Sequence, residues 1–351
     1  MILFLGFALV FGSYLNLEKA RPFYWKMVAV LLIFFAAIFT FLPPIAGSFA
    51  DARFVSRIED KKVVDLSLII DSKSVEFKES RNAYYAEASY PQHIFEKEKE
   101  IKKENIKFED SLHKKLVFDK ELLVKAFFIE EANLYKVVEL VQIEPSFIYP
   151  YVPALMQRIR NLNYHVPMAW IAVIAFCVSM IYSIKYLRNN NIANDIKASS
   201  AAMMGLMFAV LATTTGMVWA KFNWGSFWNN DPRQVTILFQ IIIYLSYFVL
   251  RSTIDEEIKK ARLSSVYSIF AFLSVPLLVF IIPRQFASLH PGAQDDGTTG
   301  PVVDPQSGML DSALALSYYI SLAAFIIIFF WLLSLNVRHR MLKRKLELLD
   351  V

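Results

Sequence analysis

Cysteine is almost absent from this chain, since Cys177 is the only one among its 351 residues. A single thiol excludes an internal disulfide and any metal cluster that several cysteines would hold. Cys177 lies in the middle of an apolar segment. We therefore interpret it as a small core side chain.

Charged residues are missing from six long stretches, although they make up 20% of the chain. Each stretch approaches or exceeds the roughly 17–25 apolar residues that cross about 30 Å of hydrocarbon as a helix. The composition agrees, with 56% apolar residues and 30 phenylalanines. We therefore predict a polytopic protein of the lipid bilayer, with spans at Met27–Ala50, Asn161–Ile184, Ala198–Ala220, Gln234–Leu250, Leu263–Pro283 and Ser312–Val337.

Ionisable groups, including histidine, are also absent from the middle of all six stretches. Ion and proton paths, and transporters of charged solutes, usually need such groups within the membrane. A membrane cytochrome with haems stacked inside its bundle would need histidines there. Any functional site is therefore expected at an edge of the membrane. The net charge of +5 does not indicate nucleic acid as a partner, because the basic residues flank the spans.

Lysine and arginine are scarce in alternate loops, which predicts the orientation because these residues mark the cytoplasmic side. The segment before the first span and the loops after the second and fourth are basic, as is the tail at 338–351. The short loops on the other side hold only Lys221, Arg233 and Arg284. Both ends of the six-span core are therefore predicted to be cytoplasmic, in a bacterial inner membrane.

The N-terminal residues 1–24 precede the first main transmembrane helix, which we expect within 25–50. Met1–Leu17 is apolar but has no basic start and no small-residue cleavage site, so a signal peptide is not expected. It is at the lower limit of length for a span. A short extra membrane helix and a helix lying at the interface both remain open.

Residues 51–157, on the outer side, mix charges heavily and form a predicted soluble insert. Leu122–Glu130 and Tyr135–Glu144 alternate around a short turn and predict a β-hairpin. Val63–Ile70 and Val75–Lys78 predict further strands, and a charged helix or loop is expected around 96–115. The fold class is an all-α polytopic membrane bundle of six helices with an inserted small, mostly β extracytoplasmic domain. Residues 158–337 supply the other five helices.

Tryptophan is concentrated between the third and fourth spans, where residues 219–236 read W-A-K-F-N-W-G-S-F-W-N-N-D-P-R-Q-V-T. So many large rings in a polar loop would expose wide apolar faces unless something covered them. One interpretation is an aromatic rim at the membrane boundary. The other is a platform for a flat, largely apolar ligand.

Two of the five histidines, His165 and His290, lie on the same predicted outer side as the Trp-rich loop. Two neutral imidazoles on opposite faces of an iron porphyrin give a six-coordinate haem. The alternative is that both cap helix ends, beside Pro167 and Pro291. The other three, His93, His113 and His339, are interpreted as surface groups. The cations available for haem propionates are Arg158, Arg160, Lys221, Arg233 and Arg284.

Asp231 and Gly225 have structural interpretations as well. Asp231-Pro232 opens the fourth span as a helix N-cap followed by proline at the first helical position. Gly225 permits a tight turn or a close backbone approach between the rings.

The loop W-G-S-F-W-N-N-D-P-R-Q-V-T resembles the "WWD" motif of the haem-handling proteins of cytochrome c maturation. The wider pattern resembles the CcmC family, with H-V-P-M-A-W opening the second span, T-G-M-V-W-A ending the third and S-L-H-P after the fifth. The resemblance covers roughly Met27–Pro44 and Leu155–Arg340.

This resemblance implies that His165 and His290 are the axial ligands of a haem b at the outer membrane face. It implies a platform made by Trp219, Trp224, Gly225, Trp228 and Asp231. Arg233, one of the cations available for the propionates, is predicted to bind haem as well. The implied function is delivery of haem to the chaperone CcmE, without enzymatic activity. The implied partners are the ABC-type subunits CcmA and CcmB and the small subunit CcmD.

The sequence departs from the family pattern in two ways. Phe227 and Asn230 stand where the motif has tryptophans, so a ring is kept at one position and lost at the other. The insert is not typical of CcmC, and docking of the chaperone, shielding of the haem edge and a lineage-specific ornament remain open. A CcsA-like haem exporter and cytochrome c synthetase is an alternative, favoured slightly by D-P-R-Q-V-T. Such proteins normally have more spans and further histidines within the membrane. A structural membrane subunit with an aromatic belt is the other alternative.

Overall fold

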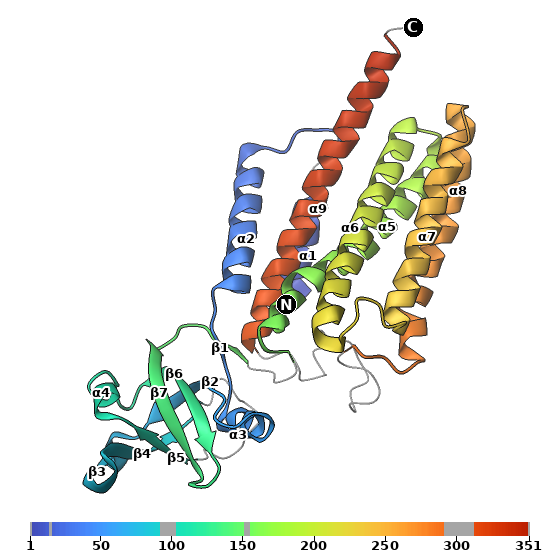
Figure 1. Ribbon diagram of the computed structural model, residues 1–351. Coiled ribbons are helices and arrows are strands. Elements are labelled where there is room, and N and C mark those ends of the chain that lie inside the picture. Colours follow the sequence, from blue (N-terminus) through green and yellow to red (C-terminus); the bar gives the residue numbers. More distant parts are fainter. Residues whose placement is uncertain (1, 14–15, 92–102, 151–154, 291–311, 350–351) are drawn as a thin grey trace. The chain divides into compact units, whose positions relative to one another are not determined.

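The computed structural model describes residues 2–13, 16–91, 103–150, 155–290 and 312–349. The chain folds as two compact units. The first contains Met1–Phe41, Arg160–Leu310 and Ala315–Val351, and it is helical (Figure 1). The second contains Leu42–Ile159 and Asp311–Leu314, and it holds the strands.

Six helices of the described residues are long and apolar enough to cross a membrane, which confirms the predicted bundle. Charge-free runs form these helices because a helix satisfies its own backbone hydrogen bonds in lipid. A short 3-10 turn, Met156–Asn161, precedes α5, and α8 continues through a π turn, Pro276–Ile281, and a 3-10 turn, Ile282–Arg284. The helices of this unit are α1 (Ile2–Ser13), α2 (Phe23–Phe41), α5 (Leu162–Asn189), α6 (Ile192–Trp224), α7 (Pro232–Ser252), α8 (Glu257–Val275) and α9 (Ser312–Glu347).

The first span differs from the prediction at its C-terminal end, because α2 stops at Phe41 rather than near Ala50. Pro43 and Pro44 follow at once, and neither can donate a backbone hydrogen bond to continue the helix. Ala50 belongs instead to the separate helix α3 (Phe49–Ile58), which begins with a capping box between Ser48 and Asp51.

The N-terminal helix α1 has 12 residues, so it is about 18 Å long, well short of a bilayer core. It packs within the helical unit, where the Trp25 indole donates to the Phe11 carbonyl at 2.9 Å. Gly12 lies directly against the ring of Phe330 on α9. The described residues of this segment therefore do not form a seventh spanning helix.

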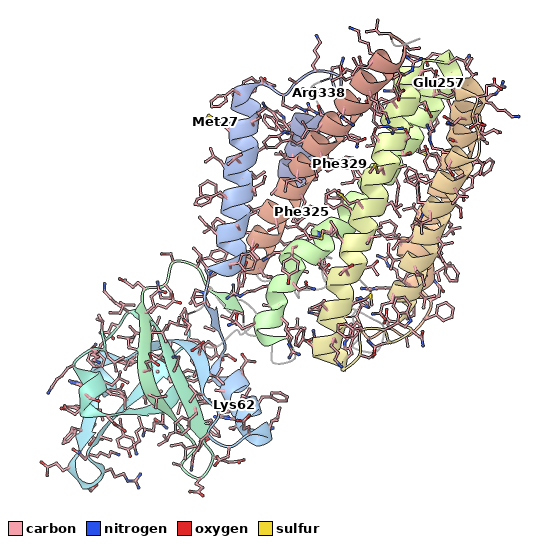
Figure 2. All side chains as sticks on the ribbon, turned by 45° about the horizontal axis from the view of Figure 1, so that its top comes forward. Met27, Lys62, Glu257, Phe325, Phe329 and Arg338 are labelled. Atoms are coloured by element: carbon pink, nitrogen blue, oxygen red, sulfur yellow. The ribbon has the colours of Figure 1, made fainter. Side chains whose placement is uncertain are left out.

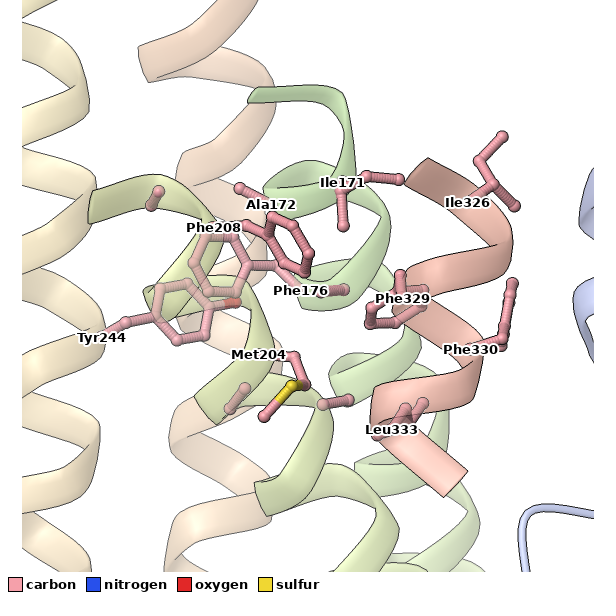
Figure 3. Packing of buried hydrophobic residues seen from close by; sticks show 14 of the residues in the cluster. Ile171, Ala172, Phe176, Met204, Phe208, Tyr244, Ile326, Phe329, Phe330 and Leu333 are labelled. Atoms are coloured by element: carbon pink, nitrogen blue, oxygen red, sulfur yellow. The ribbon is translucent and has the colours of Figure 1, made fainter. Parts of the chain in front are cut away.

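The core of the helical unit is aromatic. Phe176 of α5 stacks on Tyr244 of α7 with ring centroids 3.6 Å apart (Figure 3). Phe208 of α6 meets Phe325 of α9 at 6.5 Å. The outward faces also carry large apolar groups, including Phe34, Phe239 and Phe270, each at least half exposed. Such surfaces would be unfavourable in water and are covered by lipid in a membrane protein.

A polar cluster closes one end of this unit. Arg251 of α7 forms a two-bonded salt bridge with Asp195 of α6, at 2.6 and 2.8 Å. Arg340 of α9 donates to Ser199 of α6 at 2.7 Å. Arg338 and Glu257 lie at the same end, while Phe325 and Phe329 lie further along α9 (Figure 2). These contacts join three helices whose remaining contacts are largely apolar.

The second unit is a small barrel. Its main strands are β2 (Val64–Ile70), β3 (Glu76–Lys78), β4 (Ala83–Ser89), β5 (Glu104–Phe108), β6 (Glu121–Ile129) and β7 (Leu134–Ile143). They pair in the order β2-β6-β7-β5-β4-β3, and β2 also pairs with β4, which closes the sheet. The β5–β7 pair is parallel, and the short helix α4 (Asp110–His113) lies between β5 and β6 in sequence. This is the connectivity of an OB-type Greek-key barrel, a fold that does not by itself imply a function.

The predicted hairpin is confirmed as the antiparallel pair β6–β7, and β2 and β3 match the two other predicted strands. Helix α3 and strand β4 were not predicted, and β5 lies where a charged helix or loop was expected. In β5 the buried Ile106 and Phe108 alternate with polar residues, so a short strand was hidden in a highly charged stretch. Two short strands, β1 (Ile45–Ala46) and β8 (Tyr149–Pro150), pair in parallel near the ends of the unit.

Candidate functional site

The Trp-rich loop begins where α6 ends. Trp219 and Trp224 lie on its last turns, with ring centroids 5.0 Å apart and the rings nearly perpendicular. Gly225 then ends the helix in the left-handed conformation with φ of +81°, which only glycine adopts readily. The expected turn at Gly225 is thus present, and it lets the chain double back toward α7.

Asp231 caps the N-terminus of α7, as predicted, and accepts from the Arg233 amide at 2.9 Å with Pro232 following it. Its second oxygen accepts from the Ser288 hydroxyl at 2.7 Å and from the Leu289 amide at 2.8 Å. The carboxylate is almost fully buried. Asp231 therefore fastens the segment that follows α8 to the start of α7, a role that the sequence did not reveal.

His290 lies on this fastened segment. Its Nδ1 is 2.9 Å from Asp231 Oδ1. The imidazole contacts Trp224 edge to face at 5.0 Å and lies nearly parallel to Trp219 at 6.4 Å. The structure thus brings together His290, Asp231 and the two tryptophans that the sequence analysis selected.

The charges of this pair follow from burial and hydrogen bonding. Burial lowers the pKa of His290, although the hydrogen bond with Asp231 acts in the opposite direction. Burial alone would raise the pKa of Asp231, but the hydrogen bonds from His290 and Ser288 hold that pKa well below its usual range. At neutral pH we therefore assign a neutral imidazole that donates Nδ1–H to a carboxylate anion. This leaves the lone pair of Nε2 available.

His165 lies in the first turns of α5, where its Nδ1 is 3.1 Å from the Thr215 hydroxyl of α6. A β-carbon at Gly216 would lie only 2.7 Å from the imidazole, so the missing side chain allows this close approach. Thr215 lies one helical turn from Trp219 on α6, and Trp219 contacts His290, so both imidazoles lie against the same end of this helix. Thr215 and Gly216 were not singled out as site residues, although they open the T-G-M-V-W-A motif.

The alternative of two helix caps does not hold for His165. The N-cap of α5 is Asn161, and Pro167 lies inside the helix rather than at a turn. The ring of His290 bonds the Asp231 side chain instead of a helix end. Pro291 lies outside the described residues, as does His93 in the insert. His113 is partly buried and stacks on Tyr84 at 4.0 Å, while His339 is exposed on α9.

The remaining loop residues are more open. The Trp228 indole donates to the Asn230 side chain at 2.8 Å, so the residue that replaces a motif tryptophan orients another one. Phe227 is 51% exposed, with the Lys221 ammonium 5.8 Å from its ring centre. The side chain of Gln234 stabilises the loop. It accepts a hydrogen bond from the Asn229 amide and donates one to the Phe227 carbonyl.

The candidate cations divide into two groups. Three have backbone partners: Arg158 bonds the Leu155 carbonyl, Arg160 the Thr40 carbonyl and Lys221 the Gly225 carbonyl. Arg233 and Arg284 instead lie close enough for their like charges to repel. A carboxylate placed between two such guanidinium groups would relieve that repulsion, which suits the propionates of a haem.

Comparison with known proteins identifies the helical unit. The family model described as "CcmC: Heme exporter protein C" matches residues 147–351, more than half of the chain. The chain belongs to the CcmC family. The heme exporter protein C of Bradyrhizobium diazoefficiens is 26% identical over 193 residues, 55% of this chain and 70% of that protein. That of Rhodobacter capsulatus is 26% identical over 208 residues, 58% of this chain and 81% of that protein.

The CcmC match includes α5 to α9 and the whole candidate site. It does not include α1, α2 or the barrel strands β1 to β7. The resemblance noted for Met27–Pro44 thus lies outside the matched residues. The insert is a feature of this chain beyond the CcmC match.

Proposed function

We propose that this CcmC-family protein binds haem b at the outer membrane face and hands it to the periplasmic chaperone CcmE. The observation that carries the proposal is that His165 and His290 both lie against the same end of α6, beside Thr215, Gly216 and Trp219. His165 and His290 each have Nδ1 in a hydrogen bond, which leaves both Nε2 lone pairs for an iron.

The surroundings fit a haem as cargo. Trp219, Trp224 and Trp228 are only partly buried, so their rings can cover a flat macrocycle. Arg233 and Arg284 suit its propionates. The name of the relatives, heme exporter protein C, agrees with this cargo. Delivery by exchange of ligands forms no covalent bond within the protein, so the proposal does not include an enzymatic activity.

The proposed setting is the bacterial inner membrane, with the insert and the Trp-rich loop in the periplasm and both ends of the six-span core in the cytoplasm. This orientation follows from the basic loops. The proposed partners, besides CcmE, are the ABC-type subunits CcmA and CcmB and the small membrane subunit CcmD. These partners are inferred from membership of the CcmC family.

The absorption spectrum of the purified full-length protein tests the proposal. We expect low-spin haem in the wild type and its loss or conversion to a high-spin spectrum in His165→Ala and in His290→Ala. His113→Ala and His339→Ala are matched controls, because neither residue lies at the site, and both should keep the wild-type spectrum. A well-folded wild type that holds no haem when haem is supplied would refute the proposal.

A further inference from the structure

The two candidate ligands are held by partners of different chemistry. His290 donates to the carboxylate of Asp231, whereas the hydrogen-bond partners of His165 are uncharged, namely the hydroxyl of Thr215 and the backbone of Ala212. A carboxylate that accepts Nδ1–H makes an imidazole more basic and a stronger donor to a metal. A neutral acceptor raises the basicity of an imidazole far less. His290 is therefore expected to be the stronger metal ligand of the two.

The direction of the Thr215 hydrogen bond follows from its other contacts. Its single hydroxyl proton is directed to the backbone of its own helix, where the Leu211 carbonyl lies at 2.9 Å and the Ala212 carbonyl at 3.1 Å. With the hydroxyl proton placed there, we assign His165 the tautomer in which Nδ1–H donates to the Thr215 oxygen. This orients the imidazole of His165 without adding negative charge to it.

The Asp231 side is also the more rigidly built. Asp231 accepts from the Ser288 hydroxyl and from the backbone amides of Leu289 and Arg233, in addition to His290. Ser288 in turn accepts from the His290 amide at 3.2 Å. A carboxylate with this many donors cannot turn away without leaving them unsatisfied. His290 is therefore fixed through both its ring and its backbone.

We propose that His290 is the anchoring ligand and His165 the ligand that releases first when haem is passed on, with Asp231 and Thr215 as positioning residues that create the difference. This inference rests on the proposed function. If His165 dissociates first, one face of the iron becomes available to a ligand from the receiving partner, while His290 still binds the other face. The asymmetry thus gives the transfer a direction.

Carbon monoxide identifies the weaker ligand, because it replaces that ligand on ferrous haem. The full-length protein would be loaded with haem, reduced with dithionite and exposed to carbon monoxide. Photolysis then leaves iron bound by the ligand that stayed, and resonance Raman spectroscopy reports its Fe–N(His) stretching band. We expect Asp231→Asn to shift this band and Thr215→Val to leave it unchanged. A band that moves with Thr215→Val but not with Asp231→Asn would overturn the assignment.

The rate of carbon monoxide binding gives a second readout that does not depend on Asp231. Loss of the Thr215 hydrogen bond should weaken the His165 side, and a bond of ordinary strength corresponds to roughly two- to tenfold faster binding. Thr215→Ser should restore the wild-type rate. Should Asp231→Asn fail to hold haem, an unchanged rate in Thr215→Val would still refute the proposal. Absence of low-spin haem in the wild type would instead reject the proposed function itself.

Discussion

At the scale of single residues, Gly216 shows how a site can depend on a missing side chain. It lies on α6 where the imidazole of His165 passes closest, and an added β-carbon would stand 2.7 Å from the ring. Real β-carbons do not approach so closely, and the helix backbone cannot move without its packing partners. The imidazole would have to leave its position beside Thr215.

We therefore expect Gly216→Ala to lose most of the low-spin haem signal. Alanine favours a helix by about 1 kcal/mol over glycine, so thermal stability should stay equal or rise. Gly6→Ala is a matched control, because a β-carbon there meets nothing within 4 Å. The test compares the absorption spectrum and the melting temperature of the wild type, Gly216→Ala and Gly6→Ala. A normal haem spectrum in Gly216→Ala would contradict the close packing at His165.

Tyr135 supports a pH prediction for the barrel. It is fully buried, and its hydroxyl donates to the Phe49 carbonyl of α3 at 2.9 Å. Burial raises the pKa of Tyr135 to about 12. An unfolded tyrosine ionises near pH 10 (about its ordinary value), so between about pH 10 and 12 the unfolded state loses this proton first. The contribution of Tyr135 to stability is thus complete below about pH 10 and is lost as the pH rises.

The measurement is denaturant unfolding of the barrel, residues 42–159, followed by circular dichroism at several alkaline pH values. Stability should fall more steeply with pH in the wild type than in Tyr135→Phe, which cannot ionise. At neutral pH the variant should be less stable by about 1 kcal/mol, since it lacks one hydrogen bond. Identical alkaline slopes in the two proteins would contradict the burial of this hydroxyl.

At the scale of helices, α6 and α7 are joined at one end by the Trp-rich loop and at the other by the Asp195–Arg251 salt bridge. Both side chains of that salt bridge are nearly buried, at 7% and 11% exposure. Removal of one partner from a buried pair leaves an uncompensated charge, which typically costs about 3–5 kcal/mol. Arg340 is close enough to Arg251 to add repulsion once Asp195 is gone.

We expect Asp195→Ala to lower the melting temperature in detergent strongly. The double change Asp195→Leu with Arg251→Met should recover much of the loss, because no buried charge is then unpaired. Lys343→Ala is the control, since its salt bridge with Glu347 is exposed and should be worth under about 1 kcal/mol. A double variant as unstable as Asp195→Ala would show that the charges themselves are needed.

At the scale of the whole molecule, the chain combines a CcmC-type helical unit with a barrel that has its own core. Residues of the candidate site all come from the helical unit, and the family match begins at residue 147. The barrel core is built from its own strands and α3, including Leu66, Leu68 and Phe108. The two units therefore have separate cores.

Replacement of residues 47–147 by a flexible linker should leave the low-spin haem spectrum unchanged. The same deletion with His165→Ala is the control and should lose it. If the deletion abolishes haem binding while the helical content measured by circular dichroism persists, the site needs the barrel. If the deleted protein keeps its haem, a test of whether it still loads CcmE separates a docking role of the insert from an ornamental one.

Much of the architecture could be predicted because it depends on local properties. A run without charges that exceeds the bilayer thickness has few alternatives to a spanning helix, so all six spans could be located. The alternation in β5 was harder to recognise, because a short strand signal competes with a strongly charged background. Asp231 was recognised as a cap because capping is a contact within one turn.

By itself, the sequence determined the number of spans, the aromatic loop and the histidines that flank it, since each is a matter of composition along a short stretch. Only the tertiary structure decided that Thr215 bonds His165, 50 residues away, and that Ser288 bonds Asp231, 57 residues away. Such partners meet because helices pack at particular depths and rotations, and no local periodicity encodes them. The unequal support of the two imidazoles is therefore a property of the fold.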